Sequence, residues 1–212
     1  MPDLYRITRL RAADGGARLL VELSLEEGGV PQKEVLSLLC ARLSRLPSVG
    51  EISPETVCEL RHEAAICAAV SAGLRALGAG GSSRRHLTEK LCAKGYRREV
   101  AEVAVEELSQ KGFLKEEEGA LREAERGLLK LWGDRRILAD LRAKGYTDEA
   151  IRYAVARLRD EDGAARCAAL MRKRRLVMPE DAADQRRLLA ALVRYGYTPQ
   201  EIKGALKIAK KG

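Results

Sequence analysis

Apolar residues recur every three or four positions over most of this chain, and that spacing predicts amphipathic helices. Three segments repeat the spacing with the same ending, a glycine followed by a tyrosine. In each segment a leucine lies four residues before the glycine, and a leucine or isoleucine lies eight residues before it. The glycines, spaced 50 and 51 residues apart, are Gly95, Gly145 and Gly196. An internal period of this size indicates stacked supersecondary units.

The residues around each glycine predict the end of one helix and the start of the next. Glycine adopts the left-handed backbone of a helix C-terminal cap at little cost, and the following tyrosine is placed for the apolar contact of a Schellman cap. Thr147, Thr198 and Asp134 are predicted N-caps, and Pro199 and Glu201 fit the first turn of the helix after Thr198. Each repeat is therefore expected to hold a leading helix, a middle helix ending in Gly-Tyr, and a third helix.

The N-terminal segment has a different pattern. Apolar and polar residues alternate over 4–11 and 18–25, with Asp-Gly-Gly at 14–16 between them, which predicts a β-hairpin. We expect this hairpin to be the only sheet. A helix is predicted from Pro31 to about Leu46. Another is predicted from Pro54 to Leu77, either continuous or bent near residues 62–65.

The sequence thus predicts a mainly α-helical protein of tandem three-helix repeats with a small N-terminal β-hairpin. We place the hairpin and its helical extension in residues 1–60. We place the three repeats in residues 61–114, 115–161 and 162–212.

Composition agrees with helices and suggests an anionic partner. Of the 212 residues, 46% are hydrophobic and only 4% are aromatic. The formal net charge of +8 is uneven: residues 1–60 carry −2 and residues 61–212 carry +10. A basic repeat region fits nucleic acid or an acidic protein surface, although a solvated surface explains the charge equally well.

The residues that usually carry catalysis or metals form no recognisable motif. Walker-type glycine loops, His-Glu-x-x-His and Gly-x-Ser-x-Gly are all absent from the sequence. Cys58, His62 and Cys67 share one predicted helix, but a structural zinc ion needs about four ligands. We therefore expect no metal, no cofactor and no enzymatic activity. Five cysteines without Cys-x-x-Cys spacing, and no expected signal peptide, predict reduced thiols in a cytoplasmic protein.

Paired arginines recur near the start of each middle helix, where the helix dipole disfavours positive charge. Contact with phosphates or carboxylates explains this recurrence, and shared ancestry of the repeats explains it as well. The candidate partner- or DNA-binding residues are these pairs, two lysines beside the repeated glycines, and a later basic run: Arg84, Arg85, Arg135, Arg136, Arg186, Arg187, Lys94, Lys144, Arg172, Lys173, Arg174 and Arg175.

Along nearly its whole length the chain resembles the RecX family of bacterial recombinase regulators. The resemblance is carried by Ser83–Tyr96, Val100–Leu108, Gly112–Leu114 with acidic residues after it, and Arg135–Tyr146. The third copy and the hairpin also fit. The chain departs from the family pattern at Gly119, where a glycine replaces an aromatic residue. The resemblance implies an elongated, curved array of tandem three-helix units that is not an enzyme.

The resemblance also implies a partner, the RecA recombinase. Family members bind the helical groove of the RecA–single-stranded DNA filament and control its growth, ATP hydrolysis and strand exchange. We expect inhibition, by a monomer that contacts no membrane. Direct contact with single- or double-stranded DNA stays open.

Two other classes of protein share some of these features. A helical DNA-binding protein that acts without a recombinase would share the charge and would bind DNA with a steep salt dependence. A HEAT-like scaffold would share the repeats, but it stacks helix pairs and does not need the recurring arginines. An enzyme fits least well, because no set of nucleophile, base and orienting group is visible.

Overall fold

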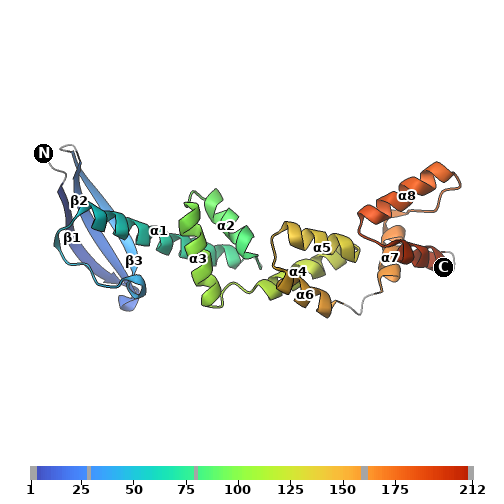
Figure 1. Cartoon of the computed structure of the whole chain (residues 1–212), viewed down its shortest axis with the longest axis horizontal. Helices are drawn as coiled ribbons and strands as arrows, with labels where there is room; N and C mark the ends of the chain where they lie inside the picture. Colours follow the sequence, from blue (N-terminus) through green and yellow to red (C-terminus); the bar gives the residue numbers. More distant parts are fainter. Residues whose placement is uncertain (1–3, 28–29, 79–80, 159–161, 210–212) are drawn as a thin grey trace. The chain divides into compact units, whose positions relative to one another are not determined.

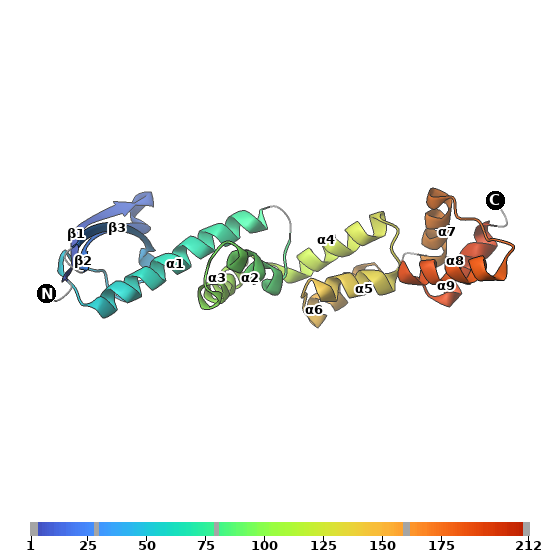
Figure 2. The same ribbon diagram turned by 90° about the horizontal axis from the view of Figure 1, so that it is seen from above.

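The computed structural model describes residues 4–27, 30–78, 81–158 and 162–209 (Figures 1 and 2). These residues form two compact units. The first holds the described residues up to 76 together with 88–113, and the second holds 77–87 together with those from 114 onward. Each unit is described separately below.

A four-stranded antiparallel sheet opens the first unit. Its strands are β1 (Leu4–Ala13), β2 (Arg18–Glu27), β3 (Val30–Leu39) and β4 (Gly50–Glu51), in the spatial order β3-β2-β1-β4. A short 3-10 helix, η1 (Asp14–Gly16), makes the predicted turn between β1 and β2. The hairpin prediction is confirmed, and the described residues form this one sheet, but it has four strands where the hairpin alone would have two.

The helix predicted from Pro31 to Leu46 was also wrong, because residues 30–39 form β3. Leu36 and Leu38 are buried in the core of the sheet, whereas Val35, on the opposite face, is 58% exposed. This alternation is the two-residue period of a strand. Leucine and valine in this segment also match a helical spacing. The edge of the β1–β2 hairpin decides between the two, because β3 pairs with its open backbone groups along ten registered positions.

One continuous helix, α1 (Pro54–Leu77), covers a face of the sheet (Figure 2). The Ser53 hydroxyl caps it by accepting a hydrogen bond from the Thr56 N–H at 3.3 Å, as the sequence predicts. Val57 and Leu60 of α1 are buried in the core that the sheet provides. The bend considered near residues 62–65 does not occur.

An arginine links α3 (Arg98–Gln110) to α1 in the first unit. Arg42 lies in the 3-10 helix η2 (Cys40–Arg42), which follows β3. It donates to Glu63 of α1 at 2.7 Å and to Glu107 of α3 at 2.5 Å. Because these groups are largely covered, the two ion pairs tie α3 to α1 more firmly than surface pairs would.

The remaining helices follow the predicted repeat order (Figure 1). Their bounds are α2 (Arg84–Ala93), α4 (Glu116–Leu129), α5 (Asp134–Ala143), α6 (Asp148–Arg157), α7 (Gly163–Arg174), α8 (Ala182–Arg194) and α9 (Pro199–Ala209). From the sequence, we expect the third helix of the second repeat to end at Asp160 and that of the third repeat to end at Lys210; both residues lie outside the described ranges.

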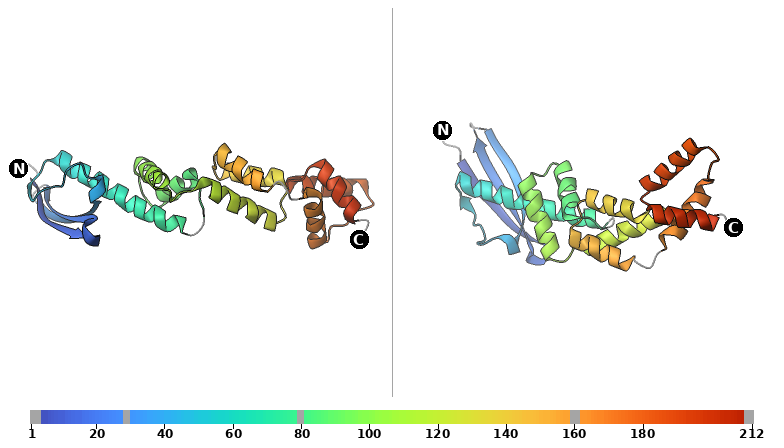
Figure 3. Two further views of the ribbon diagram at one scale, coloured as in Figure 1. Left: turned by 90° about the horizontal axis from the view of Figure 1, so that it is seen from below. Right: turned by 45° about the vertical axis from the view of Figure 1, so that its right-hand side comes forward.

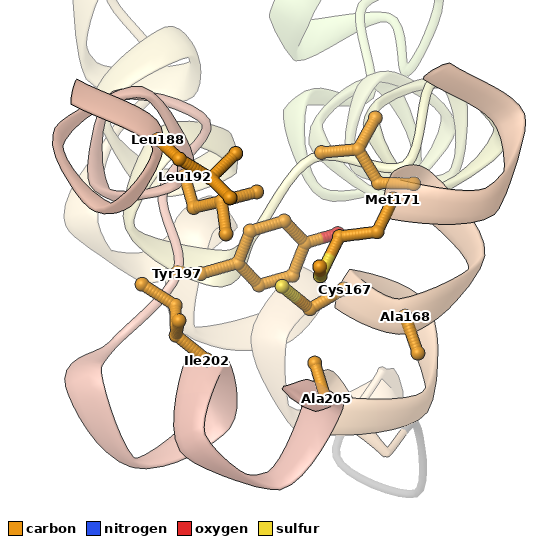
Figure 4. Close-up of a cluster of buried hydrophobic side chains, with 9 residues drawn as sticks. Cys167, Ala168, Met171, Leu188, Leu192, Tyr197, Ile202 and Ala205 are labelled. Carbon is orange, nitrogen blue, oxygen red and sulfur yellow. The ribbon is translucent and has the colours of Figure 1, made fainter. Parts of the chain in front are cut away.

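In the second unit, helices α4–α6 and α7–α9 each enclose a small core. Tyr146 is buried in the first core and Tyr197 in the second. In Figure 4 the ring of Tyr197 lies among Leu192 of α8, Met171 and Cys167 of α7, and Ile202 of α9. The repeated tyrosines at these two positions are therefore core residues, which place one aromatic ring at the centre of each three-helix unit.

Candidate interaction surface at the repeat junctions

The glycine–tyrosine turns have the predicted Schellman geometry. Gly95, Gly145 and Gly196 have φ of 94°, 74° and 96°. After each glycine, the tyrosine N–H donates to the carbonyl of the leucine four residues before the glycine, at 3.2–3.3 Å. The threonine N-caps also form: Thr147 accepts from Ala150 N–H, and Thr198 makes the full capping box with Glu201.

In the second unit, the turn of the third repeat docks on the start of α5. The Gly133 N–H donates to the Tyr195 carbonyl at 2.8 Å, and the Arg135 N–H donates to the Gly196 carbonyl at 3.3 Å. The approach is so close that a Cβ on Gly196 would lie 2.5 Å from the Arg136 nitrogen and 2.6 Å from the Arg136 Cβ. Glycine is required here both for its left-handed backbone and for this contact.

The turn of the second repeat makes a similar contact with the start of α2. A Cβ on Gly145 would lie 2.6–3.1 Å from the Cδ, Cβ and Cγ atoms of Arg85. The Ser83 hydroxyl, which accepts from the His86 N–H, donates to the Lys144 carbonyl at 2.5 Å. By contrast, a Cβ on Gly95 would meet none of the described residues within 4 Å.

The middle helices of the second and third repeats thus end on the first turn of the preceding middle helix. The carbonyl end of one helix meets the N–H end of another, so opposite ends of the two dipoles face each other. Between the second and third repeats the junction includes backbone hydrogen bonds, whereas at the start of α2 the hydrogen bond comes from the Ser83 side chain.

Two of the repeated arginines take part in these junctions. The aliphatic part of Arg85 packs against Gly145. The Arg136 guanidinium lies over the Trp132 ring at 4.3 Å and over the Tyr195 ring at 5.3 Å, so it is held between the two repeats. The recurrence of arginine therefore has a structural cause at the second position of the first two pairs.

The first arginine of each pair is exposed. These residues are Arg84, Arg135 and Arg186. The backbone N–H of Arg84 donates to the Glu116 carboxylate at 2.8 Å, and that of Arg135 is held in the junction described above, while both side chains are on the surface.

The third pair does not occupy the first turn of its helix, contrary to the prediction. Helix α8 begins at Ala182, so Arg186 and Arg187 are its fifth and sixth residues. Asp181 caps it by accepting from two backbone N–H groups at 2.8 Å and 3.0 Å, which stabilises an additional turn. Arg187 is exposed and pairs with Asp184 of that turn at 2.9 Å.

The predicted N-cap at Asp134 was also wrong. Gly133 is the N-cap of α5, and Asp134 is its first residue. The Asp134 carboxylate instead pairs with Arg166, a buried arginine of α7. Besides the glycine turn, this ion pair also links the α4–α6 repeat to the α7–α9 repeat, and the sequence did not predict it.

The other candidates are divided between paired and exposed cations. Lys144 binds Glu123 at 2.6 Å and Asp140 at 2.7 Å. Burial opposes its charge, but these two carboxylates outweigh burial and raise the pKa of Lys144. Lys94 is exposed, as is the basic run at residues 172–175, which ends α7.

The core tyrosines have perturbed acid–base properties. Burial, with the Glu123 carboxylate as the next cause, raises the pKa of Tyr146 to about 12. Burial also raises the pKa of Tyr197 to about 12, although its hydroxyl donates to the Leu131 carbonyl at 2.8 Å. Both phenols are therefore neutral hydrogen-bonding groups at physiological pH.

No group of three or more His, Cys, Asp or Glu side chains suited to a metal occurs within the described ranges. Cys58 is exposed, whereas Cys67 is buried and accepts a hydrogen bond from the Leu39 N–H at 3.2 Å. Across the part of the chain that the structure describes, no helix is both long and apolar enough to span a bilayer.

The fold and its surface together define a helical-repeat protein in which glycine turns and arginines join neighbouring repeats. No protein-family model matches the sequence. It is 33% identical to the regulatory protein RecX of Mycobacterium leprae (strain Br4923) over 137 residues, which are 61% of this chain and 78% of the relative. It is 31% identical to the regulatory protein RecX of Pelodictyon phaeoclathratiforme (strain DSM 5477 / BU-1) over 143 residues, which are 66% of this chain and 88% of the relative.

Solved structures show the same fold. A crystal structure of regulatory protein RecX matches 98% of this chain and 100% of its own with a TM-score of 0.72 at 17% identity. The crystal structure of RecX from Lactobacillus salivarius matches 70% of this chain and 98% of its own with a TM-score of 0.58 at 16% identity. The chain belongs to the RecX family of regulatory proteins.

Proposed function

We propose that this protein binds the filament that a bacterial RecA recombinase forms on single-stranded DNA, and that it inhibits filament growth, ATP hydrolysis and strand exchange. Membership of the RecX family carries the proposal. In this proposal the protein has no catalytic activity and acts as a cytoplasmic monomer through three repeats at residues 61–114, 115–161 and 162–212.

The binding surface that we propose contains the first arginine of each pair, namely Arg84, Arg135 and Arg186. Their spacing supports the choice. Gly145 lies ten residues after Arg135 and packs on Arg85, which follows Arg84. Gly196 likewise lies ten residues after Arg186 and packs on Arg136, which follows Arg135. Ten helical residues span about 15 Å, so successive arginines follow one another at roughly one helix length.

Contacts spaced in this way suit a repetitive partner. An exposed ion pair contributes only about 0.2–1 kcal/mol, so no single arginine would hold the protein on a filament. Three such contacts made together would add up to about 3 kcal/mol, or roughly a hundredfold in affinity. The acidic side chains and DNA phosphates of a recombinase filament would supply partners at regular intervals.

The test is DNA-dependent ATP hydrolysis by a bacterial RecA, with this protein added well below one copy per RecA protomer. Inhibition is expected for the unmodified protein. The double variant Arg135→Glu/Arg186→Glu should lose most of this inhibition. The control Arg152→Glu, which reverses the charge of an exposed arginine on α6, should keep it. Arg136 is unsuitable for this test because it holds the junction. Full inhibition by the double variant would contradict the proposed surface, and no inhibition by the unmodified protein would contradict the proposed function.

A second candidate function is DNA binding without a recombinase. The exposed basic run at residues 172–175, at the end of α7, favours it. This function predicts binding to bare DNA whose affinity falls steeply with salt, with a slope that decreases when the run is neutralised. RecA inhibition that persists in a variant unable to bind bare DNA would exclude it as the main activity.

A further inference from the structure

Helix α8 has apolar residues on two sides. Leu188 and Leu192 are buried in the core of the third repeat. Leu189 and Val193, each one residue further along, are 37% and 45% exposed. They are four residues apart, so they lie next to each other on a surface that turns away from the core. In Figures 1 and 3, α8 projects from the other two helices of its repeat.

The second repeat shows that this exposure is not a general feature of the middle helices. Leu138 and Arg142 hold the positions that Leu189 and Val193 hold in the third repeat, seven and three residues before the glycine. Leu138 is partly buried against the core of its own repeat, and Arg142 is charged and exposed. The third repeat thus has two exposed apolar residues where the second has one covered leucine and one arginine.

Two arginines lie beside these two residues, one toward each end of the pair. Arg186 and Arg194 are exposed on the same side of α8, and Ala190 lies between them. We define the outer face of α8 as Arg186, Leu189, Ala190, Val193 and Arg194. Exposed apolar residues inside a rim of arginines are typical of protein–protein interfaces, whereas binding to DNA phosphates does not require an apolar centre.

We propose that the outer face of α8 binds an acidic protein surface with an apolar centre. The inference rests on the proposed function, and it assigns to this face a contact with the recombinase protein itself and not with its DNA. Charge complementarity selects an acidic partner, because both rim residues of the outer face are cationic. The apolar pair would then supply affinity that salt does not screen.

The test compares the double variant Leu189→Ser/Val193→Ser with the control Val177→Ser, which changes a residue that is 81% exposed and lies outside α8. Fluorescence anisotropy of labelled protein would measure affinity for preformed RecA–single-stranded DNA filaments and for the same DNA alone. Circular dichroism would check folding. Because the replaced side chains are outside the core, the double variant should fold and should bind filaments at least tenfold more weakly. Its affinity for bare DNA should be unchanged, and the control should behave as the unmodified protein.

Several results would overturn the inference. Unchanged filament affinity of the double variant would show that the outer face of α8 makes no contact. An equal loss of affinity for filaments and bare DNA would place nucleic acid on it. Concentration-dependent dimerisation of the unmodified protein that the double variant abolishes would identify a second copy as the occupant. If the unmodified protein does not bind filaments at all, the proposed function fails first, and the inference fails with it.

Discussion

Replacing Gly196 with alanine tests the junction between the second and third repeats. Two costs add at this position. The first is conformational, because φ is 96° and an L-residue in left-handed backbone costs about 1–2 kcal/mol. The second is steric, because the new Cβ would lie 2.5 Å from the Arg136 nitrogen and 2.7 Å from the Gly133 oxygen. Both are backbone atoms, so a side-chain rotation cannot relieve the overlap.

Relief requires the turn to move away from α5. That movement weakens the hydrogen bonds from Gly133 to Tyr195 and from Arg135 to Gly196, together worth roughly 1–3 kcal/mol. We therefore expect Gly196→Ala to lower the free energy of unfolding by about 2–5 kcal/mol.

Gly95 provides a matched control. Its φ is 94° and its turn has the same Schellman hydrogen bonds, but a Cβ there would meet none of the described residues within 4 Å. Gly95→Ala should therefore cost only the conformational part, about 1–2 kcal/mol. The gain from a stiffer unfolded chain is the same in both variants and cancels in the comparison.

Urea unfolding followed by tryptophan fluorescence suits this comparison, because the chain has one tryptophan and Trp132 lies under the Arg136 guanidinium at the junction. Gly196→Ala should shift the transition to lower urea and change the native emission, whereas Gly95→Ala should leave the native emission unchanged. If the two variants lose equal stability, the close approach of Gly196 to α5 contributes nothing and the junction argument fails.

Three further predictions concern the second unit. Burial raises the pKa of both Tyr146 and Tyr197 to about 12, against an ordinary value of 10.0. Their contribution to stability is therefore present below pH 10 and is lost as pH rises from 10 to 12. Urea titrations at several pH values would detect this loss, and the loss should be smaller in the double variant Tyr146→Phe/Tyr197→Phe. Arg175 is a non-glycine residue at φ 53°, so Arg175→Gly should raise the free energy of unfolding in urea by about 0.5–1 kcal/mol. A lower free energy of unfolding would contradict backbone strain at this residue. A Cβ on Gly81 would lie 2.5 Å from the Gly119 Cα, whereas one on Gly119 would lie 3.1 Å from the Tyr146 hydroxyl, an overlap that a smaller shift relieves. Gly81→Ala should therefore cost about 1–3 kcal/mol and Gly119→Ala less, and the reverse order of melting temperatures would contradict this packing.

Features that depend on residues close in sequence could be predicted from the sequence. A Schellman turn needs a glycine and an apolar residue within six positions, and the turns at Gly95, Gly145 and Gly196 all form. The caps at Thr147 and Thr198 form for the same reason. The order of the helices in each repeat was also predicted from the spacing of apolar residues and glycines.

Features that depend on distant residues were missed. Residues 30–39 become a strand because β2 offers them a long edge, which no local pattern shows. Gly133 replaces Asp134 as the cap because Gly196 approaches it closely. Helix α8 begins four residues before Arg186 because Asp181 caps it with two hydrogen bonds, whereas the N-cap of α5, Gly133, has no side chain to make one. Alignment of the three copies on their glycines did not show that difference.

The departure from the RecX pattern at Gly119 has an explanation of the same kind. This residue is buried on α4, where Gly81 approaches its Cα and the Tyr146 hydroxyl lies nearby. An aromatic side chain at this position would have to displace both neighbours. The glycine therefore accompanies a local packing in which the segment before α2 runs directly over α4.

Recurrence in a sequence thus combines two requirements that only the structure separates. Gly95 meets the need for a helix cap, whereas Gly145 and Gly196 also meet a need for close contact with the preceding repeat. The same distinction applies within an arginine pair, where Arg136 joins two repeats and Arg135 is exposed beside it. Loss of Arg136 would disturb the junction between the second and third repeats, because its guanidinium lies over Trp132 and Tyr195 there. A binding defect therefore identifies a contact residue only when the free energy of unfolding is unchanged, and Arg135 meets the structural condition for such a test whereas Arg136 does not.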